Sequence, residues 1–170
     1  MKHLFWAMAL LLCVGCGGSD SSEPKEKARI EKSIKDDLGR DGIYQLGDYY
    51  NRNGNEGVVI KIWNDGCNGM ILSLNETECN WREAKQWCRN HGDGWRLPTK
   101  DELEAIYRNK RDINYGLTRC NGSKLQDSFY WSSTEHEYDS ERAWRVNMLG
   151  GNTYDFSKFG NNYVRAVFDF

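Results

Sequence analysis

The 170-residue sequence has little proline, little net charge and no apolar run long enough to cross a membrane. Only two Pro against 17 Gly exclude collagen-like and proline-rich repeats and indicate a chain with many tight turns. A formal net charge of -2 gives no electrostatic reason to expect nucleic-acid binding. Aromatic residues make up 13% of the chain, which is too many for a disordered protein. We therefore expect one globular domain.

The N-terminus carries an export pattern. Residues 4–12 are almost wholly apolar, but a bilayer span needs about 20 such residues, so this run fits the core of a secretory signal. Small Gly15 then precedes Cys16, in a pattern that resembles a bacterial lipobox. We predict a signal peptide over 1–15 and a lipid on Cys16, the first residue of the mature chain. The alternative is an ordinary cleaved signal with an incidental cysteine.

The composition changes twice after the signal. Residues 16–40 are rich in Ser, Gly and charged side chains and are predicted to be the lipidated cysteine and a tether, followed by a globular domain over 41–170. The acidic, Ser-rich start at 17–23 resembles the surface-export signal of some Gram-negative lipoproteins. We predict a protein of the bacterial outer membrane, displayed on the cell surface and held there by its lipid alone. A periplasm-facing position is the alternative.

Local patterns within 41–170 predict both helices and strands. Asn80 with Glu83, and Thr99 with Glu102, are N-terminal capping pairs, and each is followed by an apolar stripe at helical spacing. Strands are predicted at 49–50, 57–63, 70–74, 129–134, 143–149 and 163–168. The order of strands, two helices, a long loop and further strands predicts an α+β fold.

Four cysteines follow the predicted lipid site, and an even number in an exported chain favours two disulfides. They are Cys67, Cys79, Cys88 and Cys120. A helix over 81–90 would hold Cys79 and Cys88 about 13 Å apart, beyond the roughly 7 Å that a disulfide allows between Cα atoms. The pairings left are 67–79 with 88–120, which we prefer, and 67–88 with 79–120. The spacing fits no zinc site, so no metal is expected.

Several motifs together point to a family. They are Trp-Arg-Glu-Ala-Lys-Gln-Trp-Cys at 81–88, Gly-Trp-Arg-Leu-Pro-Thr-Lys-Asp-Glu-Leu at 94–103, Tyr-Trp-Ser-Ser-Thr-Glu at 130–135 and Tyr-Val-Arg-Ala-Val at 163–167. The chain thereby resembles the Lcl C-terminal-domain family of bacterial surface proteins over about 57–168. The resemblance implies a C-type-lectin-like fold, with two helices packed on small antiparallel sheets and long loops. It implies no chemistry, because lectin-like domains include sugar binders, protein binders and enzymes.

No catalytic or metal-binding arrangement can be assembled from the sequence. Trp63-Asn64-Asp65 lies too early for a calcium-dependent sugar site, and no proline occurs after Pro98. No cysteine follows Cys120, which argues against formylglycine-type oxidase chemistry, and Ser132-Ser133 lacks a nucleophile elbow. We expect no enzyme activity and no cofactor.

The segment 136–162 has a different character, because it combines Tyr, Asn, Ser and Gly, the residue types common in recognition surfaces. The candidate ligand-binding residues are His136, Tyr138, Arg142, Asn147, Asn152, Tyr154, Phe156, Lys158 and Asn162. Alternation with Val146 and Met148 places Trp144 in the core instead. We predict non-catalytic recognition of an extracellular glycan or protein. The alternative is a structural subunit of a surface assembly.

Overall fold

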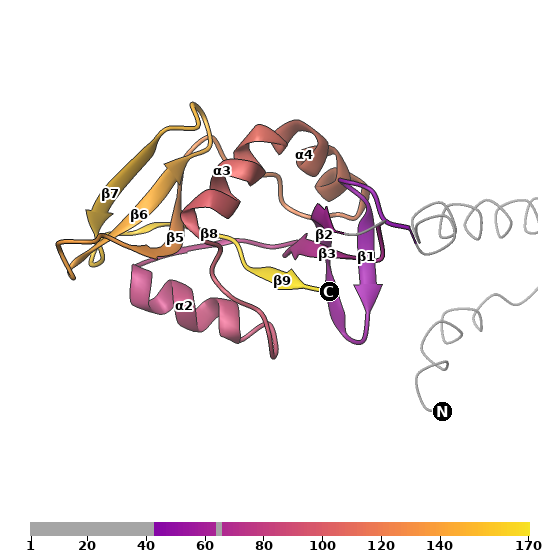
Figure 1. Cartoon of the computed structure of the whole chain (residues 1–170), viewed down its shortest axis with the longest axis horizontal. Coiled ribbons are helices and arrows are strands. Elements are labelled where there is room, and N and C mark those ends of the chain that lie inside the picture. Colours follow the sequence, from indigo (N-terminus) through magenta and orange to yellow (C-terminus); the bar gives the residue numbers. More distant parts are fainter. Residues whose placement is uncertain (1–42, 64–65) are drawn as a thin grey trace, which may run out of the picture. The chain divides into compact units, whose positions relative to one another are not determined.

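The computed structural model describes residues 43–63 and 66–170, and all structural statements refer to these (Figure 1). The predicted signal peptide, the lipid site Cys16, the tether and Asn64-Asp65 lie outside the described residues. Within that part of the chain, no helix is both long enough and apolar enough to cross a membrane.

One sheet has four antiparallel strands in the order β1-β2-β3-β9. The strands are β1 (Tyr49–Arg52), β2 (Asn55–Trp63), β3 (Asn68–Leu72) and β9 (Val167–Asp169). Asn53 and Gly54 connect β1 to β2 with φ angles of 53° and 83°. Two consecutive left-handed residues suit the tight turn of a hairpin, and Asn-Gly adopts them readily.

The second sheet has five strands in the order β4-β8-β5-β6-β7. They are β4 (Thr77–Cys79), β5 (Phe129–Glu135), β6 (Arg142–Asn147), β7 (Thr153–Ser157) and β8 (Asn162–Val164). The neighbours are antiparallel except for β5 and β8, which pair in parallel at Tyr130 and Tyr163. Neither β4 nor β7 was predicted, and β7 makes the middle of the proposed recognition segment a regular edge strand.

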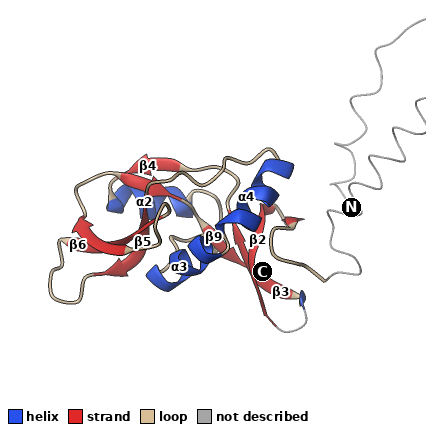
Figure 2. Ribbon diagram, turned by 90° about the horizontal axis from the view of Figure 1, so that it is seen from above, coloured by secondary structure: helices blue, strands red, loops and turns tan. Residues whose placement is uncertain are grey.

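Within the described part of the chain, three helices pack on the sheets (Figures 1 and 2). They are α2 (Trp81–Arg89), α3 (Lys100–Arg108) and α4 (Lys110–Arg119). Helix α2 contributes to one core cluster, with Trp81, Ala84 and Cys88, while α3 and α4 contribute to the other. The prediction of two helices was therefore one helix short, because α4 occupies what we expected to be a long loop.

The predicted strand 163–168 is in fact two strands in different sheets. The chain leaves β8 in one sheet, passes Arg165 and enters β9 in the other. Arg165 is only 1% exposed. Its guanidinium donates to the backbone oxygens of Ser73 and Ser123 and pairs with Glu76. A buried arginine therefore ties the two sheets together at the point where the strand pattern appeared unbroken.

The structure shows no disulfide among the four described cysteines, so the predicted disulfides are not present. Both predicted pairings require Cys120 to bond Cys79 or Cys88. Cys79 and Cys88 belong to the α2 core cluster, whereas Cys120 packs against the other cluster and Cys67 is exposed. Burial raises the pKa of the Cys88 thiol to about 12, and nearby Cys79 adds to the rise. The two cysteines that helix geometry seemed to separate therefore lie in the same cluster.

Candidate functional site

The β6–β7 hairpin divides the predicted ligand-binding residues between two faces. Residues that lie directly opposite each other in an antiparallel pair project from the same face of the sheet. The registered pairs include Arg142 with Ser157, Ala143 with Phe156, Trp144 with Asp155, and Arg145 with Tyr154. Arg142, Trp144 and Asp155 therefore share one face, and Arg145, Tyr154 and Phe156 share the other. The nine predicted residues do not form a single site.

The face with Phe156 has a structural role centred on Arg145. The guanidinium carbon lies 4.0 Å from the ring centre of Phe129 and 3.9 Å from that of Phe156. Its Nη1 donates to Oδ1 of Asn162 at 3.0 Å. Asn162 is 5% exposed and serves the fold here, and its contact with a ligand stays a prediction. We call this arrangement the Arg145 clamp.

Two further predicted residues also serve the fold. The Lys158 ammonium bonds the Glu135 carboxylate and the Ser140 backbone oxygen, and it lies 4.3 Å from the Trp81 ring. It therefore holds the loop after β5 against α2. Asn147 accepts a hydrogen bond from the Leu149 amide at 2.9 Å, which stabilises the turn after β6.

Two predicted residues stay accessible on or near the Phe156 face. Asn152 is exposed in the turn before β7, and its backbone oxygen accepts from the Asn147 amide. Tyr154 is exposed, and its ring packs edge-on against Phe129 at 5.9 Å. Both lie away from the aromatic residues on the opposite face of the hairpin.

The opposite face gathers an open cluster of rings and charges. We call it the Trp144 patch, and it consists of Lys100, His136, Tyr138, Arg142, Trp144 and Asp155. The His136 imidazole stacks on the Trp144 indole with ring centres 5.8 Å apart and planes inclined by 30°. The Tyr138 ring lies 6.2 Å from His136 and is 90% exposed. The Tyr138 ring is thus open to solvent, while His136 and Trp144 are half-buried.

Charged groups frame these rings. The Lys100 ammonium lies 4.9 Å from the Trp144 ring, and Arg142 forms an ion pair with Asp155. The hydrogen bond from Arg142 holds the pKa of the Asp155 carboxyl below its usual range. His136 accepts through Nδ1 from the Tyr138 amide at 3.3 Å. This arrangement can stack on a ligand and exchange hydrogen bonds with it, but it positions no nucleophile beside a base.

The prediction that Trp144 belongs to the core was wrong for a simple reason. Trp144 and Val146 share a face of β6, and Val146 is buried in the cluster that contains α3. Helix α3 begins at Lys100, however, and Lys100 is the residue that lies over Trp144. The strand therefore extends past the helix that covers it. Alternation along a strand shows which face a residue occupies but not where the covering helix ends.

Exposed apolar side chains concentrate in the same part of the chain. Six large hydrophobic residues are exposed among the described residues, and four of them lie within 136–162. These four are Tyr138, Leu149, Tyr154 and Phe159, and the other two are Ile43 and Tyr115. Exposed apolar side chains in one region are typical of an interaction surface.

The Trp144 patch is an open surface. Four hollows of about 320 to 640 Å³ lie elsewhere on the described domain, and none of these four is lined by a residue of 136–162. Among the described residues, no group of three or more His, Cys, Asp and Glu side chains could hold a metal ion.

Comparison with known proteins agrees with the sequence motifs. The profile of the Lcl C-terminal domain matches residues 59–168, so the family prediction and the α+β fold class are confirmed. Botrocetin has 12% identity and a TM-score of 0.41, covering 71% of this chain and 94% of botrocetin. EMS16, an antagonist of a collagen-receptor integrin, has 10% identity and a TM-score of 0.40, covering 74% and 98%. No curated protein matches the chain.

Proposed function

The chain belongs to the Lcl C-terminal-domain family, and we propose that it is a non-catalytic recognition protein that binds an extracellular protein or glycan. In this proposal a lipid on Cys16 holds the protein on the outer surface of a bacterium, and the Trp144 patch makes the contact. The observation that carries the proposal is the stack of His136 on Trp144 beside the almost fully exposed Tyr138 ring.

The composition of the patch suits recognition. Rigid aromatic rings give large contact area at low entropic cost, and they dominate the energetics of many interfaces. Lys100 and the Arg142–Asp155 pair place both signs of charge at the edge of the rings. Such an edge can satisfy the hydroxyl groups of a sugar or the backbone of a protein. The rings supply affinity, and the charges supply orientation.

The test is binding by the full chain to glycan arrays and to extracellular proteins. Tyr138→Ala is the decisive variant, because a side chain that is 90% exposed contributes little to folding. We expect it to weaken binding by roughly 30-fold, the loss that corresponds to truncating an aromatic hot spot worth about 2 kcal/mol. Tyr115→Ala on α4 is the matched control, because it removes another exposed tyrosine outside the patch. Equal affinities for the two variants would exclude the patch.

The anchor has its own test. The mature protein should carry acyl chains on Cys16, which intact-mass measurement detects, and Cys16→Ser should move it from the membrane fraction to the soluble fraction. Stable anchoring needs more than one acyl chain. A mature chain without a lipid would remove the anchor from the proposal and leave the recognition surface to be judged separately.

One observation favours a second candidate, an accessory subunit of a surface assembly. Leu149 and Phe159 are exposed apolar residues at turns of the same sheet. In an assembly they would be buried against a permanent partner. This candidate predicts that a partner protein co-purifies with the chain in fixed stoichiometry. Loss of that partner in Leu149→Ser or Phe159→Ser, but not in Tyr138→Ala, would support it over the first candidate.

A further inference from the structure

The chain enters the domain beside α4. Ile43, the first described residue, is exposed, and the segment that follows it packs across the helix. A Cβ atom added at Gly116 would lie 2.2 Å from the backbone oxygen of Gly47, so glycine is required where the two backbones meet. Figure 1 shows this entry at the end of the domain opposite the β6–β7 hairpin. The described part of the chain therefore begins at the α4 end of the domain.

The solvent side of α4 is basic and aromatic. A hollow of about 640 Å³ is lined by Arg111, Asp112, Asn114, Tyr115, Thr118 and Lys124. Arg111 and Lys124 are exposed, and neither forms a salt bridge with another described residue. Tyr115 is 68% exposed, and the Arg119 guanidinium lies 5.9 Å from its ring centre. We call Arg111, Tyr115, Arg119 and Lys124 the α4 surface. Asp112 is the one acid lining this hollow.

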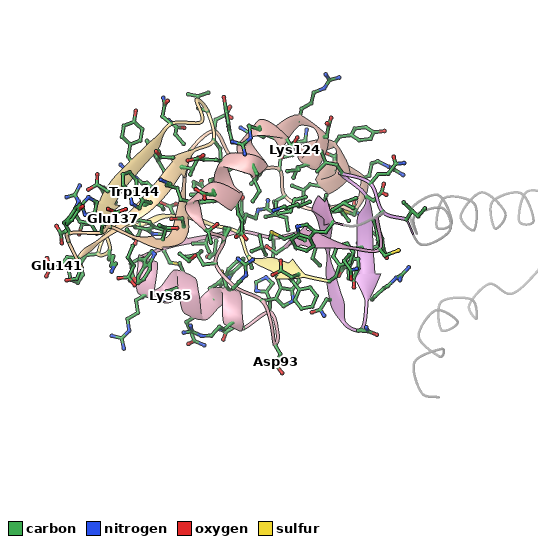
Figure 3. The ribbon with its side chains drawn as sticks, viewed as in Figure 1. Lys85, Asp93, Lys124, Glu137, Glu141 and Trp144 are labelled. Atoms are coloured by element: carbon green, nitrogen blue, oxygen red, sulfur yellow. The ribbon has the colours of Figure 1, made fainter. Side chains whose placement is uncertain are left out.

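The opposite end of the domain is acidic. The end of β5 and the loop after it carry four acids within seven residues, Glu135, Glu137, Asp139 and Glu141. Glu135 pairs with Lys158, whereas Glu137 and Glu141 are exposed. Figure 3 shows Glu137 and Glu141 at the end that holds the hairpin and Lys124 by α4. The exposed acids Glu137 and Glu141 therefore lie at the Trp144 patch end, beside the paired Arg142 and Lys158, while the unpaired Arg111 and Lys124 lie where the described chain begins.

From this arrangement we propose that the α4 surface rests on the anionic lipid headgroups of the membrane that holds the chain. The headgroup phosphates would contact Arg111 and Lys124, and the Tyr115 ring would lie at the interface. An anionic bilayer attracts the α4 end and repels the acidic loop, so the Trp144 patch points outward. This inference rests on the proposed lipid on Cys16, and it adds a direct protein contact to the lipid.

A weak contact is enough for this purpose. Each Lys or Arg near an anionic surface strengthens binding about fivefold, and tyrosine prefers the membrane interface. The predicted tether 16–40 has 25 residues, and a flexible chain of that length has a root-mean-square span of about 25–30 Å. A tether of that span gives an effective concentration on the order of millimolar. Under these conditions the α4 surface sets the orientation of the domain while the lipid provides the attachment.

Lysine footprinting of the acylated full chain tests the orientation. The chain is placed in phosphatidylcholine vesicles with or without phosphatidylglycerol, and amine labelling at each lysine is read by mass spectrometry. We expect labelling of Lys124 to fall about fivefold with phosphatidylglycerol and to recover at high salt, because salt screens the attraction. Labelling of Lys85 on α2 should stay constant. Equal labelling of Lys124 in the two kinds of vesicle would overturn the inference. Protection of Lys85 as strong as that of Lys124 would also overturn it.

Two charge reversals make the test specific. Arg111→Glu should abolish the protection of Lys124, whereas Arg82→Glu, the same change at an exposed site on α2, should preserve it. Protection of Lys124 by inorganic phosphate without vesicles would show a soluble-anion site and overturn the membrane assignment. Intact mass of the same sample reports acylation of Cys16. A chain without acyl groups counts against the proposed anchor, while an acylated chain with unprotected Lys124 counts only against the orientation.

Discussion

Replacing Arg165 with methionine should cost a large part of the stability of the domain. Arg165 donates to the Ser73 oxygen at 2.6 Å, to Glu76 Oε2 at 3.1 Å and to the Ser123 oxygen. Methionine retains much of the volume but leaves the largely buried Glu76 carboxylate without its cation and two backbone oxygens without a donor. Breaking a buried ion pair by removing one partner costs about 3–5 kcal/mol. Typical domains have only about 5–15 kcal/mol of stability.

Urea denaturation followed by tryptophan fluorescence measures this loss. Glu76→Gln and the double variant complete a cycle that isolates the Arg165–Glu76 interaction. Tyr130 also donates to Glu76 Oε2, at 2.6 Å, so the glutamine variant keeps one partner. We expect the double variant to lose at least about 1 kcal/mol less than the sum of the single variants, because Arg165→Met alone leaves an unpaired charge. Additive losses, or an Arg165→Met loss below about 1 kcal/mol, would refute this reasoning.

Three further predictions follow from the described contacts. Gly116→Ala should destabilise the domain by about 2 kcal/mol in urea titrations despite its gain in helix propensity, because the added Cβ would lie 2.2 Å from a backbone oxygen; a stabilised variant would contradict the packing. Burial raises the pKa of the Glu102 carboxyl. The hydrogen bonds from Arg96 and the capping contacts lower it by a larger amount, so this pKa lies below its usual value. The stability gained from Glu102 is therefore present above the unfolded pKa of about 4.3 and is lost as the pH falls through the folded pKa. As the pH is lowered, the free energy of unfolding of Glu102→Gln should fall less steeply than that of the original chain, and identical curves would contradict this prediction. A thiol reagent added without reductant should label exposed Cys67 at once and Cys88 only on unfolding, because burial raises the Cys88 pKa to about 12; recovery of fewer than four free thiols after unfolding would contradict the structure.

The sequence predicted well those parts of the fold that depend on neighbouring residues. The Asn80 side chain accepts from the Glu83 amide, and Thr99 with Glu102 forms a full capping box, as the spacing indicated. Helix α4 was missed because it follows Asn109 directly, with no side-chain cap hydrogen bond to mark its start. Its buried residues Ile113, Gly116 and Leu117 have helical spacing, but glycine in that stripe obscured the pattern.

The candidate site was harder to predict because its boundaries depend on distant residues. Asn162 has the residue type of a ligand contact, yet its partner Arg145 lies 17 positions away and holds it in the interior. Trp144 has the residue type of a core position, yet the start of α3 at Lys100 leaves it at the surface. The segment 136–162 was therefore identified by composition, while the tertiary contacts decided which of its members face solvent.

The Arg145 clamp has an evolutionary consequence. It fixes β5, β6 and β7 through side chains that belong to the strands, together with Asn162 of β8, and none of these groups belongs to the turns at 136–141 and 149–152. Exposed side chains in those turns can therefore change without removing a contact of the Arg145 clamp. Doubling the length of a flexible loop costs only about 0.6 kcal/mol. Under the proposed function, mutations in these turns would therefore alter the binding surface at small thermodynamic cost, because the clamp and the turns are held by different residues.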